Sequence, residues 1–166
     1  AFETTGARGS STYVMGMHKS DESLRVAMRE NASMFKEEGY ETNYDGFDPN
    51  DPDTYIALSL RQNVNLDASL TLGAAIQSQF RDRVGRKDRG VKQAGFYVIS
   101  YTTMPSTLVE LGFLTNPEEE DFLQSDNGKA YMASAIYRAF RDTYLASRTP
   151  PSVSYTHLTL PTIAGV

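Results

Sequence analysis

Short β-branched and aromatic runs alternate with longer segments of helical periodicity along this chain of 166 residues. Three runs predict strands: residues 10–17 (SSTYVMGM), 95–101 (GFYVISY) and 107–111 (TLVEL). Apolar residues at helical spacing predict helices over 21–38, over 53–84, and between Asn116 and 148. Strands that alternate with helices favour helices packed on a sheet. The sequence therefore predicts an α/β layered domain with a largely parallel or mixed sheet flanked by helices.

Local signals mark where these helices begin. Ser20 is a predicted N-cap. Asn116, with Glu119 three residues further on, has the pattern of a second helix start. The segment 53–84 is either one helix or two in tandem, with the break expected at 63–65. The last helix carries a predicted apolar stripe of five residues: Ala133, Ile136, Tyr137, Phe140 and Tyr144.

Composition excludes several classes of protein. The chain has 16 basic and 21 acidic residues, a net charge of −5, which argues against general nucleic-acid binding. It has no cysteine, which excludes a disulfide framework and any Cys-ligated zinc. No apolar run approaches the roughly 20 residues that a membrane-spanning helix needs.

The character of the chain changes after Pro151. Residues 153–162 (VSYTHLTLPT) continue no pattern and resemble the translation of a transposase sequencing adapter, with a native linker as the alternative. We therefore expect one domain over 1–148 and a non-native or disordered tail over 149–166.

Glu110 is a lone carboxylate in an apolar strand. Burying a carboxylate costs several kcal/mol, of order 5, unless it is paired, hydrogen-bonded or near a metal. In open α/β sheets, sites assemble at the carboxyl ends of strands, and Glu110 lies near such an end. The residues alone leave two interpretations open. Glu110 is either a functional group or a structural one, facing the surface or paired with an arginine.

A wider pattern surrounds Glu110. Residues 104–120 (MPSTLVELGFLTNPEEE) closely resemble the C-terminal signature of zinc-dependent N-acetylmuramoyl-L-alanine amidases. Further matching segments follow the family order: 7–14 (ARGSSTYV), 29–33 (RENAS), 89–96 (RGVKQAGF) and 135–140 (AIYRAF). The resemblance covers essentially residues 1–146, as the C-terminal portion of a catalytic domain.

This resemblance implies a zinc-hydrolase-like fold and hydrolysis of the amide between N-acetylmuramic acid and L-alanine in peptidoglycan, for cell-wall remodelling or daughter-cell separation. Family members hold zinc with two His and one Glu, and leave a position open for water. The family glutamate that matches Glu110 acts on that water as a general base.

The start of the chain, Ala1-Phe2, resembles the segment just after the family's last zinc ligand. The resemblance therefore implies that zinc belongs to the complete protein, that its three ligands are absent from this chain, and that the chain alone is inactive. His18 and His157 match no ligand position, and we expect His18 to be a solvated histidine.

Each of two charged segments has two interpretations, one as a functional segment and one as ordinary solvated surface. Residues 81–92 carry six cations that either contact stem-peptide carboxylates or form a solvated helix end: Arg81, Arg83, Arg86, Lys87, Arg89 and Lys92. The acidic stretch 37–53 lies where regulated amidases insert a segment over the zinc site. It either places Glu37, Glu38 or Glu41 there or is a surface loop.

Peptidoglycan is the partner that the resemblance implies, with a regulatory activator protein as a further candidate and neither nucleic acid nor a membrane span. The substrate places the protein in the periplasm or cell envelope. A non-catalytic peptidoglycan-binding domain of the same fold is the alternative function, and an unrelated α/β domain in which Glu110 is ion-paired is a third.

Overall fold

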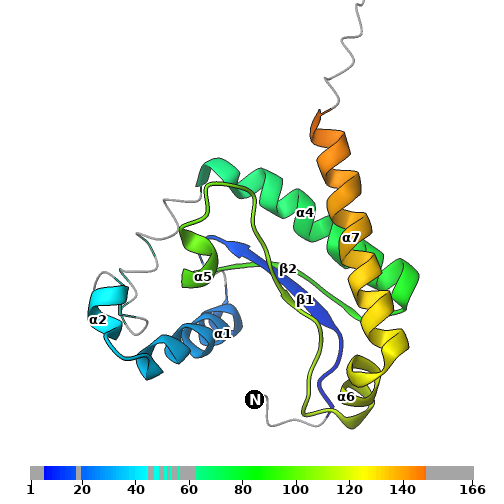
Figure 1. Cartoon of the computed structure of the whole chain (residues 1–166), viewed down its shortest axis with the longest axis horizontal. Helices are drawn as coiled ribbons and strands as arrows, with labels where there is room; N and C mark the ends of the chain where they lie inside the picture. Colours follow the sequence, from blue (N-terminus) through cyan, green and yellow to red (C-terminus); the bar gives the residue numbers. More distant parts are fainter. Residues whose placement is uncertain are drawn as a thin grey trace, which may run out of the picture.

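The computed structural model describes residues 6–17, 20–44, 47–48, 51, 53, 56 and 63–148. A sheet with the strand order β2-β1-β3 lies at its centre (Figure 1). The central strand β1 (Ser10–Met15) pairs in parallel with β2 (Asp88–Ala94) and antiparallel with β3 (Leu108–Glu110). Helices flank this mixed sheet, and the predicted α/β class is confirmed.

The two faces of the sheet carry separate apolar cores. Tyr13 and Met15 of β1 pack in one core with helix α1 (Asp21–Asn31) and with Phe96. The other core joins helix α4 (Leu66–Gln79), the π-helical turn Phe80–Val84 and helix α7 (Asp126–Arg148). Because side chains alternate across a strand, β3 contributes Leu108 to the first core and Val109 to the second.

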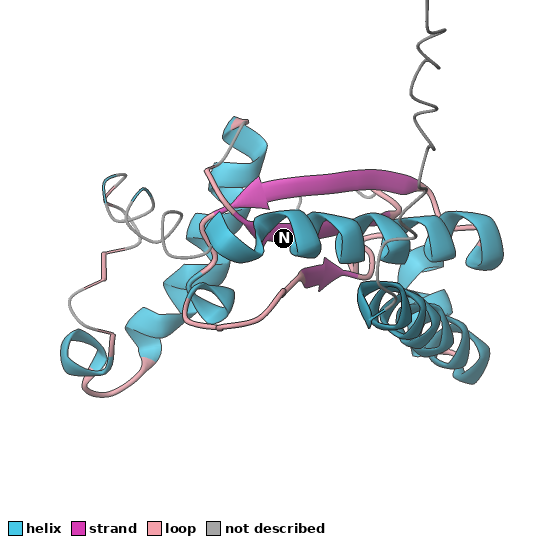
Figure 2. Ribbon diagram, turned by 90° about the horizontal axis from the view of Figure 1, so that it is seen from above, coloured by secondary structure: helices cyan, strands magenta, loops and turns pink. Residues whose placement is uncertain are grey.

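Helix α4 runs alongside the strands of the sheet (Figure 2) and approaches them closely at Gly73. A Cβ at Gly73 would lie 3.1 Å from Cγ1 of Val91 and 3.2 Å from Cγ2 of Thr12, so a small residue is needed at this crossing. One turn further on, the side-chain amide of Gln77 lies 2.8 Å from Oγ1 of Thr12, and both residues are buried. The lack of a side chain at Gly73 lets α4 approach β1, and the hydrogen bond between Gln77 and Thr12 holds the two elements together.

The strand predicted over 95–101 is wrong. The strand is β2 at 88–94, which includes part of the cationic segment 81–92, and Tyr97–Ser100 form the short helix α5. The buried side chain of Asn31 explains the change, because its amide nitrogen donates to Gly95 O at 2.8 Å and its oxygen accepts from Tyr97 N at 3.0 Å. These backbone groups are therefore not available for hydrogen bonds to a neighbouring strand.

Most of the helix starts are confirmed. The hydroxyl of Ser20 accepts from Ser23 N at the start of α1, which continues as a 3₁₀ helix over Ala32–Lys36 before the short helix α2 (Tyr40–Asn43). A 3₁₀ turn over Asn63–Asn65 precedes α4, at the predicted break. The side chain of Asn116 caps helix α6 (Pro117–Gln124).

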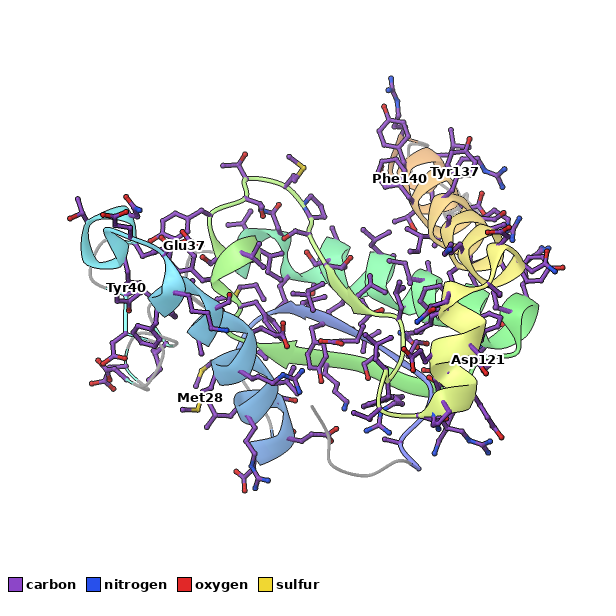
Figure 3. All side chains as sticks on the ribbon, turned by 60° about the horizontal axis from the view of Figure 1, so that its bottom comes forward. Met28, Glu37, Tyr40, Asp121, Tyr137 and Phe140 are labelled. Carbon is purple, nitrogen blue, oxygen red and sulfur yellow. The ribbon has the colours of Figure 1, made fainter. Side chains whose placement is uncertain are left out.

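The buried stripe of α7 differs from the predicted one. Met132, Ala135 and Ala139 are buried, whereas Tyr137 and Phe140 are 63% and 56% exposed. Figure 3 shows these two aromatic side chains on the outer side of α7. The helix has two apolar faces, and small residues fill the one next to α4 because the two helices pack closely there.

Within the part of the chain that the structure describes, no helix combines the length and apolar character needed to cross a membrane. The predicted tail over 149–166 lies outside the described residues.

Candidate active site

Glu110 ends β3 on the α1 side of the sheet, opposite Ser11 of β1. Its side chain lines a cavity of about 250 Å³ between α1, the strands and the loop that follows β3. Residues from each element line this cavity: Ser11, Tyr13, Glu22, Val26, Arg29, Glu30, Arg89 and residues 112–115. The structure therefore places the predicted site residue in a concave site lined by charged and aromatic groups.

The surroundings of Glu110 favour its protonated form. Burial raises the pKa of its carboxyl, and the neighbouring Glu30 carboxylate raises it further, while Arg29 acts in the opposite direction. The Arg29 guanidinium is itself engaged, because it lies 2.8 Å from the Glu30 carboxylate. Among the described residues Glu110 thus has no dedicated counter-ion, and a carboxyl with a raised pKa is suited to proton transfer.

Glu22 pairs with two cations of β2, and one of them, Arg89, lines the Glu110 cavity. Its carboxylate lies 3.0 Å from Arg89 and 3.1 Å from Lys92, and hydrogen bonding to Lys92 is the main cause of its lowered pKa. The Arg89 guanidinium also covers the ring of Phe113 at 5.1 Å. Burial, together with the carboxylates of Glu22 and Glu110, raises the pKa of Tyr13 to about 12.

The six cations of residues 81–92 do not act as one group. Arg81 pairs with Asp82 and Asp88 on the surface, and Arg86 pairs with Glu119. Arg89 is the one among the six that lines the Glu110 cavity in the described structure. Contact of this segment with stem-peptide carboxylates stays a prediction.

The loop after Glu110 is anchored by a residue that the sequence assigned to a helix cap. The Glu119 carboxylate accepts from Gly9 N at 3.1 Å and Phe113 N at 3.4 Å, and it pairs with Arg86. Glu119 therefore joins the start of β1 to the loop after β3. The helix cap itself is made by Asn116, whose oxygen accepts from Glu118 N at 3.0 Å.

The other candidate residues lie apart from the Glu110 cavity or outside the described residues. His18, His157 and the side chain of Glu41 belong to the second group. Glu37 is exposed, and its carboxylate accepts a hydrogen bond from the Tyr44 hydroxyl at 2.6 Å. Across the described ranges, no three His, Cys, Asp or Glu side chains lie where they could hold a metal ion.

Comparison with known proteins assigns the fold to a family. The profile of the N-acetylmuramoyl-L-alanine amidases matches residues 1–142. The chain belongs to this amidase family. A crystal structure of an N-acetylmuramoyl-L-alanine amidase from Clostridium difficile 630 shares the fold, with a TM-score of 0.55 and 21% identity over 90% of this chain.

The chain is also similar to three further proteins, two of which are named as N-acetylmuramoyl-L-alanine amidases. The uncharacterized protein YqiI of Bacillus subtilis is 43% identical over 46% of this chain, and N-acetylmuramoyl-L-alanine amidase LytC of the same organism is 40% identical over 56%. N-acetylmuramoyl-L-alanine amidase AmiA of Escherichia coli is 36% identical over 49%. The matched regions span 37%, 18% and 28% of these proteins, and 54% of the Clostridium difficile chain.

Proposed function

We propose that the complete protein hydrolyses the amide bond between N-acetylmuramic acid and L-alanine in peptidoglycan, with Glu110 as the general base. Family membership supports the reaction, and the position of Glu110 supports its role. The observation that carries the proposal is a half-buried carboxylate at the end of a strand, in a cavity, with a raised pKa and no dedicated counter-ion among the described residues.

The environment of Glu110 suits proton transfer. A general base works best when its pKa lies near the working pH, and burial beside Glu30 moves the pKa of this carboxyl upward from 4.5. In the proposed mechanism, Glu110 takes a proton from the attacking water and delivers it to the amine of L-alanine as the amide bond breaks. Phe113 and Leu114 line the same cavity and add apolar surface to it.

The described residues do not form a zinc site. A catalytic zinc needs three protein ligands, and Glu110 alone is a single weak donor. We propose that the zinc of the complete protein is held by ligands outside the described residues, and we assign none of those ligands to this chain. Glu110 then acts as a base beside the metal and not as a ligand.

The substitution Glu110→Gln tests this role in a complete, zinc-loaded enzyme. The glutamine keeps the shape of the side chain but cannot take a proton, so release of stem peptide from peptidoglycan should fall by about two to four orders of magnitude. Zinc content should stay unchanged. The matched control is Glu118→Gln, an exposed residue of the same signature, which should keep full turnover. Near-normal turnover of the Glu110 variant with zinc bound would assign Glu110 to a structural role.

A non-catalytic peptidoglycan-binding domain is the second candidate. The observation that favours it is the lack of a three-donor group in the described parts of the chain. Complete wild-type protein separates the two candidates, because an amidase frees new L-alanine amino termini from purified peptidoglycan, and a binding domain retains the polymer without releasing any.

The proposed substrate sets the location and the partners. Peptidoglycan lies outside the cytoplasmic membrane, so we propose action in the periplasm or cell envelope. A regulatory activator protein, and the covering of the site by residues 37–53, stay predictions.

A further inference from the structure

A second cavity, of about 570 Å³, lies beside the Glu110 site. Glu30 lines both cavities, so they adjoin along helix α1. Leu108 lines the second cavity and Glu110 the first, and these two residues point to the same side of β3. Two strand positions span about 7 Å, so one short peptide can contact both cavities.

Tyrosine rings form one wall of this second cavity. The ring centre of Tyr97 lies 5.1 Å from that of Tyr44 and 4.9 Å from that of Tyr101. Phe47 packs on Tyr97 at 5.0 Å and is buried, so the wall is braced from the core. Tyr101 is 46% exposed and presents ring surface at the open end. Tyr44 directly follows α2, Tyr97 begins α5 and Tyr101 directly follows it, and the three rings form a preorganised aromatic surface.

The charged side chains that line this second cavity are two carboxylates, one of which, Glu30, pairs with Arg29. Glu30 and Glu37 line the cavity, and none of the described residues that line it is Lys or Arg. The hydrogen bond from Tyr44 to Glu37 fixes one carboxylate against the aromatic wall, at the position labelled in Figure 3. The negative charge also extends to the first cavity, because the Glu30 carboxylate raises the pKa of Glu110.

We propose that this second cavity binds the side-chain ammonium group of the diamino acid in the peptidoglycan stem peptide. Tyrosine faces attract cations through their quadrupole, and nearby carboxylates add direct charge attraction. The other charged groups of a stem peptide are carboxylates, which Glu30 and Glu37 repel. The inference rests on the proposed function, because the amide to be cut then lies at Glu110 while the amine reaches the tyrosines.

Two peptides that differ in one charge test the proposal on this chain. The probes are N-acetyl-L-Ala-γ-D-Glu-L-Lys and the same peptide with the lysine amine acetylated. The N-terminal acetyl group removes the only other cation. Titration of each into the chain, followed by NMR, should show the amine peptide binding about five- to thirtyfold more tightly, the range expected for a partly desolvated cation on aromatic rings.

Variants locate the effect. Glu37→Gln should weaken binding of the amine peptide about three- to tenfold and leave the acetylated peptide unchanged. Glu38→Gln, the exposed neighbour that does not line the cavity, is the matched control. Tyr101→Leu should also weaken the amine peptide, whereas Tyr101→Phe keeps the ring and should bind it normally. Circular dichroism checks that each variant is folded.

Several results would overturn the proposal: equal affinity for the two peptides, no binding of either, or equal behaviour of the Glu37 and Glu38 variants. The Glu110→Gln experiment tests the proposed general base independently of the ammonium site. If Glu110 proves structural while the amine preference holds, the proposed base fails and the ammonium site stands. If turnover falls as expected but the chain shows no amine preference, the ammonium site alone fails.

Discussion

Arg86 and Glu119 form a buried ion pair that ties the turn before β2 to the start of α6, with side chains that are only 9% and 7% exposed. The same Arg86 guanidinium donates to Leu111 O at 3.2 Å, in the residue directly after Glu110. Its carbon lies 4.9 Å from the ring centre of Phe122, so the cation is also covered by an aromatic face. The position of Glu110 thus depends on an ion pair that does not itself line the Glu110 cavity.

Loss of the Glu119 carboxylate should be costly. Glu119→Ala leaves the Arg86 cation buried without its partner and frees the backbone amide of Gly9, so the free energy of unfolding should fall by about 3–5 kcal/mol. Urea unfolding measures the change. Glu118→Ala removes an exposed carboxylate of the same helix and should stay within about 0.5 kcal/mol of wild type. Similar costs for both substitutions would show that the pair contributes little.

Gly112 should tolerate no side chain while this ion pair is intact. A Cβ there would lie 2.6 Å from the Glu119 carboxylate and 2.8 Å from the Arg86 guanidinium. Gly112→Ala should therefore cost about 1–3 kcal/mol of unfolding free energy by overpacking. In Gly112→Ala/Glu119→Ala, the total cost should be smaller than the sum of the two single costs, because Glu119→Ala removes the closer of the two contacts. Strict additivity in the double variant would contradict this account.

The contrast between local and long-range contacts explains which features the sequence could predict. The caps that Ser20 and Asn116 form reach backbone groups only two or three residues further on, so both caps were predictable. Glu119 also had a local interpretation, as a capping partner. Its actual partners include Gly9, which is 110 positions away and which a linear pattern does not show.

The misassigned strand has the same cause. Residues 95–101 have strand composition. However, the Asn31 side chain forms hydrogen bonds to the backbone on both sides of Phe96, and the Phe96 side chain lies in the core. Glu110 was predictable as a candidate because a carboxylate in an apolar strand is a chemical exception. The neighbouring tyrosine wall was not, because Tyr44 lies at the end of α2 while Tyr97 and Tyr101 lie at the two ends of α5, and these helices meet only in the folded chain.

The two apolar faces of α7 should differ in their effect on stability. Met132 is 3% exposed and packs in the core with Ile76 and Phe80, so Met132→Ala should cost about 2–5 kcal/mol. Phe140 is 56% exposed on the outer face, and Phe140→Ala should change the free energy of unfolding by no more than about 0.5 kcal/mol. Urea unfolding of the two variants compares them directly. A large cost at Phe140 would mean that the outer face is covered in solution.

The raised pKa of Glu110 gives the folded chain a defined pH dependence. A carboxyl whose pKa is higher in the folded state holds its proton longer there, so its ionisation opposes folding as the pH rises above its ordinary value of 4.5. Glu110→Gln should therefore be more stable than wild type at about pH 7 and equally stable at about pH 4, where both side chains are neutral. Urea unfolding at both pH values is the measurement. A variant that is less stable at neutral pH would mean that the Glu110 carboxylate is stabilised by a cation.

Glu30 should shift the acidic limit of activity that Glu110 sets in the complete enzyme. The general base must be ionised to act, so kcat/KM should fall as the pH drops through the raised pKa of Glu110. Glu30→Gln removes the nearby carboxylate and releases Arg29 from its 2.8 Å pair, and both changes favour the Glu110 anion. The acidic limb of the pH profile should therefore move to lower pH. Glu38→Gln serves as the control, since this exposed carboxylate does not line the Glu110 cavity, and its limb should stay in place. If Glu30→Gln leaves the acidic limb in place, or moves it to higher pH, the limiting ionisation belongs to a group other than Glu110.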